Sequence, residues 1–356
     1  MWMKRWARRG LAMMTAVVVT LLFVELGLRV VQRVRAGTPI FHFGLSGPAS
    51  VTNPREPVVP DAELGWVASA GYHFQGDIQD ADGSHRTISV SQGRYGLRAY
   101  GDPTRGPRVL VIGDSYTQAL CVDDQDTYYA RLAKATGYQV FAGGTTGWGT
   151  LQELQYLSRV LGEIKPDIIV WQMSYNDFMD NDFELGQRWR SGCQTSVRPY
   201  WNHHAIEYKY SCHGAWASIF RLGYLLVTRL DRMRAQPPAD DQLLNEMVRQ
   251  GETHAGLVAA AATTSSIFDE LLRRVGNIPV VFFIIDAASP PFAPVARKLA
   301  DDHHFIFVND VPEYLNRARR VHAVIECADR VHLNTEGHRL IAKALLPALV
   351  PLPPRR

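Results

Sequence analysis

The fold is decided by the stretch Arg108-Val-Leu-Val-Ile-Gly-Asp-Ser-Tyr-Thr117, in which an apolar run ends in a glycine, an aspartate and a serine. A short apolar run followed at once by turn residues is typical of a buried strand in a parallel sheet. In open α/β sheets, reactive groups gather beyond the carboxyl ends of the strands, where loops converge and helices begin. The stretch therefore predicts a strand that delivers the hydroxyl of Ser115 to this edge.

Apolar strand patterns alternate with helical patterns along the rest of the chain, and this alternation indicates a parallel sheet with helices on both faces. We predict an α/β fold with three layers, α/β/α, around a five-stranded parallel sheet. The expected strands cover residues 109–112, 139–141, 168–172, 280–285 and 305–308, and the clearest helices cover residues 257–275 and the segment after Thr335.

A carboxylate and an imidazole three residues apart, Asp329 and His332, precede the last predicted helix. Together with Ser115 they have the composition of a nucleophile, a base and an acid that orients the base. The same spacing occurs in Asp301-Asp-His-His304, but those residues precede a strand, at the opposite edge of the sheet. We expect them to form a solvated loop, and we expect His338 to lie on the surface of the last helix.

Two further strand ends offer hydrogen-bond donors for an oxyanion. One predicted strand runs into Gly143-Gly144, and the next runs into Tyr175-Asn-Asp177. A glycine lets a substrate oxygen approach a backbone N–H, and the Asn176 amide donates without adding charge. The predicted oxyanion hole therefore consists of the Ser115 and Gly144 backbone and the Asn176 side chain.

Gly-Asp-Ser, a glycine-rich turn, Asn-Asp and Asp-x-x-His, in this order, resemble the four blocks of the SGNH/GDSL hydrolase superfamily over residues 106–348. The resemblance implies a flavodoxin-like sheet, Ser115 as nucleophile, Asp329 and His332 as triad partners, and the oxyanion hole just described. Ala142 replaces the asparagine usual in the second block, and Ser174 replaces the glycine usual two residues before the block-three asparagine. Neither of these positions carries the chemistry directly, so the departures bear on the subfamily.

The first ten residues carry four cations, and an apolar stretch from Leu11 to Val24 follows. Leu26–Val31 extends this stretch to the length of a membrane span, with Arg29 able to snorkel. A cleaved signal peptide is the alternative, but no small-x-small cleavage site follows. We expect a single-pass anchor over residues 1–35 in the inner (cytoplasmic) membrane, with the remainder on the periplasmic, extracytoplasmic side.

Residues 36–105 are rich in Gly, Pro and Ser and predict a lead-in of loops and short strands in which Trp66 or Arg98 could border the cleft. Residues 106–350 form the predicted hydrolase domain. It contains an insertion at about 178–249 whose aromatic residues either line a substrate groove or form the core of a small cap. Irregularly spaced histidines in the insertion predict solvated loops.

Composition is ordinary for a globular enzyme, with 46% hydrophobic and 21% charged residues and a net charge of +3. No basic stripe with interleaved aromatics indicates nucleic acid, and no Cys-x-x-Cys spacing indicates zinc, so neither nucleic acid, metal nor cofactor is expected. Of the four cysteines, Cys121 follows the serine loop and Cys327 precedes Asp329. We hypothesise that these two form a disulfide, while Cys193 and Cys212 share an irregular segment.

These features predict a serine esterase that acts through an acyl-enzyme on an ester substrate, an O-acetyl or short acyl group of a cell-envelope glycan. Three alternatives remain open at this level. The same residues serve an O-acyltransferase or a lipid esterase such as a lysophospholipase, and the fold also serves non-catalytic binding modules.

Overall fold

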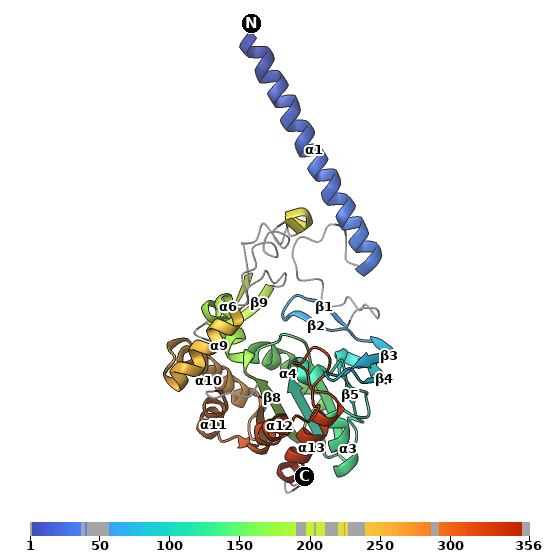
Figure 1. Cartoon of the computed structure of the whole chain (residues 1–356), viewed down its shortest axis with the longest axis vertical. Helices are drawn as coiled ribbons and strands as arrows, with labels where there is room; N and C mark the ends of the chain where they lie inside the picture. Colours follow the sequence, from blue (N-terminus) through green and yellow to red (C-terminus); the bar gives the residue numbers. More distant parts are fainter. Residues whose placement is uncertain are drawn as a thin grey trace.

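The computed structural model of the 356-residue chain describes residues 2–36, 40, 57–189, 197–202, 204–210, 220–223, 225–226, 239–285 and 292–350. A long N-terminal helix, α1 (Trp2–Ala36), projects from an α/β body (Figure 1). Its segment Arg8–Val31, 24 residues of mean hydropathy 2.3, meets by length and composition the requirement for a membrane span. A signal sequence near an N-terminus meets the same requirement.

The base of α1 touches the insertion. The Glu25 carboxylate accepts hydrogen bonds from the backbone N–H groups of Arg221 and Leu222, at 3.0 and 2.9 Å, and from Arg29 Nε at 2.7 Å. Figure 1 shows the helical turn of these insertion residues beside α1. A glutamate that interrupts the apolar sequence is therefore satisfied by protein donors rather than left unpaired.

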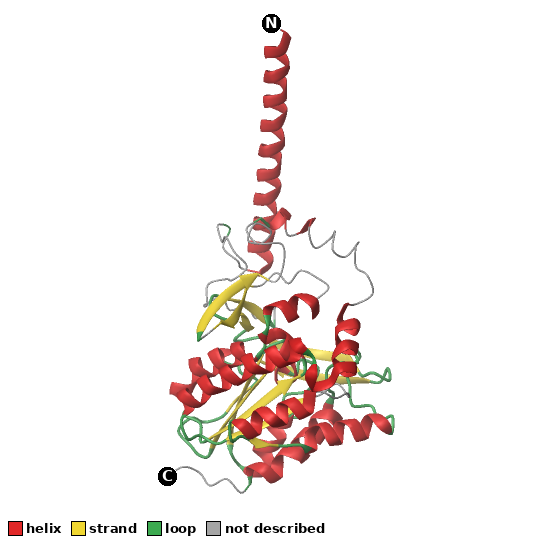
Figure 2. Cartoon of the chain, turned by 90° about the vertical axis from the view of Figure 1, so that its left-hand side faces the viewer, coloured by secondary structure: helices red, strands yellow, loops and turns green. Residues whose placement is uncertain are grey.

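The body is a mixed sheet between two layers of helices (Figure 2). The predicted parallel sheet is confirmed, with strands in the order β12-β11-β8-β6-β7 and one antiparallel edge strand, β5 (Ala99–Tyr100), added beside β7. The parallel strands are β6 (Arg108–Gly113), β7 (Gln139–Gly144), β8 (Ile168–Ser174), β11 (Val280–Ile285) and β12 (Ile306–Phe307). Strand β5 was not predicted, because a strand of two residues is too short to show an alternating pattern.

Each face of the sheet is covered by its own helices. One apolar cluster joins the sheet to α4 (Thr150–Ile164), α10 (Ala255–Val275) and α11 (Phe292–Asp302). A second cluster on the opposite face joins it to α3 (Tyr128–Thr136), α12 (Asp310–Arg320) and α13 (Thr335–Leu349). Central strand β8 is buried at every residue, because both of its faces meet a helix layer.

The segment between α1 and the sheet contributes two hairpins, β1 (Val58–Asp61) with β2 (Gly65–Ala68) and β3 (His73–Gln79) with β4 (His85–Ser91). The insertion contributes α5 (Asn176–Asn181), α6 (Phe183–Trp189), the hairpin of β9 (Val197–Asn202) and β10 (Ala205–Tyr210), and α9 (Ala239–Gln250). Tyr200 of the hairpin is buried and packs edge-to-face on Phe183, with ring centroids 5.4 Å apart. Tyr208 of the same hairpin is exposed. Buried Tyr200 therefore fits the core of a small cap, and exposed Tyr208 is accessible to a ligand, so the described residues do not decide between the two interpretations.

Two expectations about histidines were wrong. His303 is buried, and its Nδ1 lies 2.7 Å from the Leu299 carbonyl oxygen, whereas Asp301, Asp302 and His304 are exposed as expected. His338 is 1% exposed, and its Nδ1 accepts the Tyr128 backbone N–H at 3.1 Å. The start of α3 has an otherwise orphaned N–H there, and the imidazole satisfies it.

His338 predicts a pH dependence of stability. Burial, reinforced by the charges of Arg98 and Arg131, lowers the pKa of His338 from 6.5 to about 3. The unfolded chain binds this proton below pH 6.5 and the folded chain does not, so stability falls as pH drops from 6.5 towards 3, by about 1.4 kcal/mol per unit. Urea unfolding at pH 7 and pH 5 measures this loss. In His338→Asn, whose Oδ1 also accepts the N–H, the loss is smaller; an equal loss in both proteins contradicts the assignment.

Candidate active site

The nucleophile candidate lies at the junction of β6 and a short helix, α2 (Ser115–Gln118). Asp114 caps this helix, since its Oδ1 accepts the Tyr116 N–H at 2.9 Å, and half-buried Ser115 occupies the first helical position. A Cβ on Gly113 would overlap the side chains of Gln172 and Thr117, so only glycine lets the strand turn here. The turn places Ser115 just beyond the carboxyl end of β6.

The base candidate is held by a carboxylate of the same loop. His332 Nδ1 lies 2.5 Å from Asp329 Oδ2, and Asp329 Oδ1 accepts the backbone N–H groups of Val331 and His332 at 3.0 and 2.9 Å. Burial raises the pKa of Asp329, but these hydrogen bonds outweigh it and hold the pKa below the ordinary value. Asp329 therefore stays ionised, and the imidazole nitrogen that can take a proton from a nucleophile is Nε2.

The structure brings these three residues to one cavity of about 260 Å³, lined by Ser115, Gln118, Leu120, Cys121, Thr146, Asp329 and His332. Side chains from two stretches far apart in the sequence, residues 115–121 and 329–332, thus converge on a space that fits a small ligand group. A larger groove of about 410 Å³ lies between α10 and α11, away from these residues.

The other two predicted residues lie at the ends of neighbouring strands. Gly144 pairs in register with Gly113, and a Cβ on it would overlap the carbonyl oxygens of Gly113 and Asp114. Asn176 begins α5 and is separated from the end of β8 by one residue. Strand β8 pairs with β6 on the side opposite β7. Neither residue lines the cavity itself. Their placement at the carboxyl ends of strands flanking Ser115 fits the edge where the sequence places an oxyanion hole.

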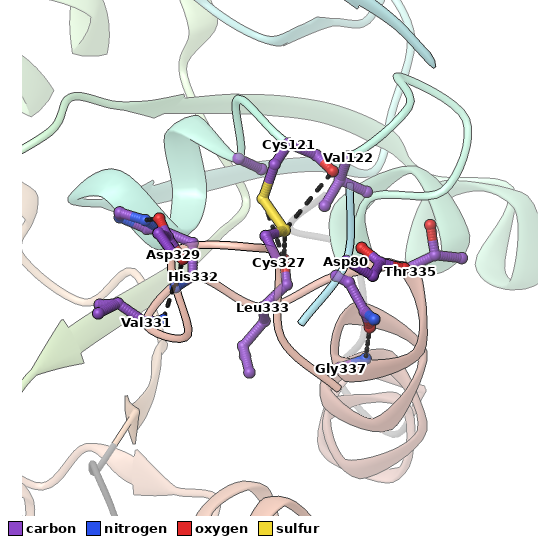
Figure 3. Close-up of a disulfide and its surroundings, with 12 residues drawn as sticks. Asp80, Cys121, Val122, Cys327, Asp329, Val331, His332, Leu333, Thr335 and Gly337 are labelled. Atoms are coloured by element: carbon purple, nitrogen blue, oxygen red, sulfur yellow. Dashed lines mark hydrogen bonds and ion pairs between the residues drawn. A yellow bond between two sulfur atoms is a disulfide. The ribbon is translucent and has the colours of Figure 1, made fainter. Parts of the chain in front are cut away.

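A disulfide joins the serine and histidine loops. Cys121 and Cys327 are bonded, with Cα atoms 6.6 Å apart, which confirms the pairing hypothesis (Figure 3). The figure shows the bridge beside Asp329 and His332, and Cys121 also lines the cavity. Cys193 and Cys212 lie outside the described residues.

Two arginines from the lead-in segment hold the same loops. Arg98 is buried and donates to the carbonyl oxygens of Gln118, Ala119 and Val122 at 2.6 to 3.1 Å, while Arg86 donates to the Cys121 carbonyl at 2.7 Å. Arg98 thus does not border the cleft; it fixes the shape of the loop behind Ser115.

This role of Arg98 was not predicted, because three of its partners are main-chain oxygens, which leave no mark in the sequence, and the fourth is the distant side chain of Asp124. Trp66 is likewise buried and donates its indole N–H to the Thr146 carbonyl, at the margin of the cavity. Among the residues that the structure describes, no group of three or more His, Cys, Asp or Glu side chains is arranged for a metal. His204 is exposed, and His203 and His213 lie outside the described part of the chain.

Several solved structures resemble this chain at low identity. The crystal structure of TesA shares 17% identity at a TM-score of 0.40 and covers 69% of this chain and 99% of its own. A lipase/acylhydrolase from Enterococcus faecalis shares 14% identity at 0.38, covering 70% of this chain and 100% of its own. A catalytic mutant of Axe2, an acetylxylan esterase from Geobacillus stearothermophilus, shares 17% identity at a TM-score of 0.35. The match covers 68% of this chain and 93% of the Axe2 chain. No protein-family model and no curated protein matches. At these identities the chemistry of this chain rests on its own residues.

Proposed function

We propose that the protein is a serine esterase of the SGNH/GDSL type that hydrolyses an acetyl or other short acyl ester. The observation that carries the proposal is the shared cavity, which is lined by Ser115 and by a histidine, His332, that is hydrogen-bonded to Asp329. A hydroxyl, an imidazole and an orienting carboxylate on one small cavity are the parts that acyl transfer needs. The order of the four sequence blocks gives independent support.

In the proposed mechanism, His332 Nε2 takes the Ser115 proton while Ser115 Oγ attacks the ester carbonyl carbon. Asp329 holds the imidazole by Nδ1 and stabilises the imidazolium. The oxyanion sits between the Ser115 N–H, the Gly144 N–H and the Asn176 amide, and each donor lowers the barrier by roughly 3 kcal/mol. The imidazolium then protonates the leaving alcohol, and a water activated by His332 hydrolyses the acyl-enzyme.

The proposed location is a membrane surface on the extracytoplasmic side. Residues 1–35 serve as the anchor, residues 36–105 as the lead-in and residues 106–350 as the hydrolase domain. The cationic N-terminus and the exposed apolar surface of α1 support this arrangement. A cell-envelope glycan ester is then the proposed substrate, because the cavity accommodates a small acyl group and a polymer would approach from outside.

Ester chain length tests the substrate class. The full-length protein in detergent, assayed with p-nitrophenyl acetate, butyrate and decanoate, is expected to show kcat/KM falling with length, by about tenfold or more from acetate to decanoate. The physical reason is that the cavity beside Ser115 has a volume of only about 260 Å³ and must hold both the acyl chain and part of the leaving group.

Three other outcomes would revise the proposal. A preference for decanoate supports a lipid esterase instead. Turnover that appears only when a sugar hydroxyl is added supports an acyltransferase. Turnover that is unchanged in Ser115→Ala shows that the activity does not come from this site.

A further inference from the structure

The Asn176 side chain is held by two partners that fix which way its amide points. Its Nδ2 donates to Asp180 Oδ2 at 3.0 Å, and its Oδ1 accepts from Ser174 Oγ at 2.6 Å. The other carboxylate oxygen of Asp180 lies 3.4 Å from the guanidinium of buried Arg198. An ion-paired carboxylate accepts hydrogen bonds and donates none, so the amide group facing Asp180 is the NH₂ and the group facing Ser174 is the carbonyl.

The Ser174 hydroxyl then has more partners than it has hydrogens. It lies 2.6 Å from Asn176 Oδ1 and 2.6 Å from Asp114 Oδ2, and both distances are those of O–H···O hydrogen bonds. A hydroxyl carries one hydrogen, which the carbonyl oxygen of Asn176 takes. The second contact requires a hydrogen from the other side, and Asp114 is the group that can supply it.

The surroundings of Asp114 favour the protonated form. Its side chain is fully buried, and the buried carboxyls of Glu153 and Asp177 lie near enough to interact electrostatically with it. Burial is the largest effect and raises the pKa of Asp114. Donors to an ionised Asp114, namely the Ser174 hydroxyl, the Tyr116 N–H and the Gln172 side chain, and the charge of His332 act the other way on this pKa and do not outweigh burial. Several buried like charges in one region cost more than neutral acids do.

We propose that Asp114 is a neutral carboxylic acid that donates to Ser174 Oγ, and that the chain Asp114–Ser174–Asn176 positions the oxyanion-hole amide. Asp180 holds one Nδ2 hydrogen of Asn176, which leaves the second hydrogen for the oxyanion. A neutral Asp114 also places no negative charge behind the developing oxyanion, where charge would oppose its formation. Ser174 and Asp114 are thus positioning residues. Their role in catalysis rests on the proposed function, whereas the protonation of Asp114 does not.

Infrared difference spectroscopy tests the protonation directly, without an activity. The full-length Asp114→Asn protein is compared with the unmodified protein at pH 7, because Asn keeps both hydrogen bonds, its NH₂ donating to Ser174 and its oxygen accepting from Tyr116 N–H. The expected difference is loss of a protonated carboxylic C=O band. Asp301→Asn, at an exposed carboxylate, is the matched control and loses an ionised carboxylate band. Loss of the ionised band in Asp114→Asn as well would overturn the proposal.

Ser174→Ala gives a second spectroscopic reading if Asp114→Asn does not fold. Removing the acceptor from a neutral Asp114 shifts its C=O band to higher frequency. A shift in the ionised carboxylate band in its place contradicts the proposal as clearly as the first experiment would.

Kinetics test the positioning role. Ser174→Ala is expected to lower kcat about tenfold with little change in KM, because the amide acts on the oxyanion and not on the bound ester. Ser174→Thr keeps the hydroxyl and should retain most of kcat. For the same reason, kcat of Asp114→Asn, which can still donate to Ser174, should be higher than kcat of Asp114→Ala. Equal kcat in all Ser174 variants rejects the positioning role. If the infrared result holds while Ser115→Ala retains esterase activity, the proposed function fails and the protonated Asp114 stands.

Discussion

Ser115→Ala is expected to lower kcat for p-nitrophenyl acetate by about 10⁴-fold or more, and His332→Ala by a similar factor. Both residues line the same cavity. In the proposed mechanism Ser115 needs His332 to remove its proton, and His332 has no proton to remove without Ser115. The double variant should therefore be no slower than either single variant, since residues that act as a unit are strongly non-additive. Steady-state rates of all three proteins, corrected for uncatalysed hydrolysis, measure this.

Ser266→Ala is the matched control for this prediction, because its hydroxyl bonds only its own helix at the Ala262 carbonyl in α10. Its activity should equal that of the unmodified protein. A Ser115→Ala protein that is folded and still hydrolyses the ester at the full rate would remove Ser115 from the mechanism. Full biological activity of Ser115→Ala in cells would favour a binding module instead.

Loss of the disulfide is the second large effect expected. The bridge spans 206 residues of sequence. A closed loop of this size reduces the entropy of the unfolded chain and stabilises the folded state by about 5 kcal/mol. Cys121→Ser with Cys327→Ser, or reduction of the unmodified protein, should lower the free energy of urea unfolding by that order. Activity should fall too, since Asp329 and His332 follow Cys327 closely and the bridge ties them to the serine loop.

Two measurements check the disulfide. Alkylation and mass analysis should find Cys121 and Cys327 protected until the protein is reduced. Reductant should then destabilise the unmodified protein and leave the double serine variant unchanged. Identical unfolding of the two proteins without reductant would show that the bridge does not form, or that it contributes nothing to stability.

Much of the sheet was accessible from the sequence because buried parallel strands are continuous apolar runs, and the strand that ends at Gly113 is one. The pairing of Asp329 with His332 was accessible because it is local, three residues apart. The disulfide was only a hypothesis, since proximity of Cys121 to Cys327 depends on two loops meeting across the sheet edge.

Other contacts between distant segments escaped prediction. His338 follows Glu336 in a polar-looking first turn, but an N–H of another helix, 210 residues away, needs its ring. Ser174 appeared as a departure from a pattern, and only the structure shows a hydroxyl between Asp114 and Asn176. The roles of such residues depend on partners in other segments of the chain, and the local sequence pattern does not show which partners these are.

The sulfur bridge also determines what a protease can do to this protein. Ser115 precedes Cys121 and His332 follows Cys327, so a cut anywhere from residue 122 to residue 326, the insertion included, leaves both on fragments that stay covalently joined. The nicked protein runs as one species until it is reduced, and then as two. Nucleophile and base therefore belong to one covalent unit independently of the peptide chain that lies between them.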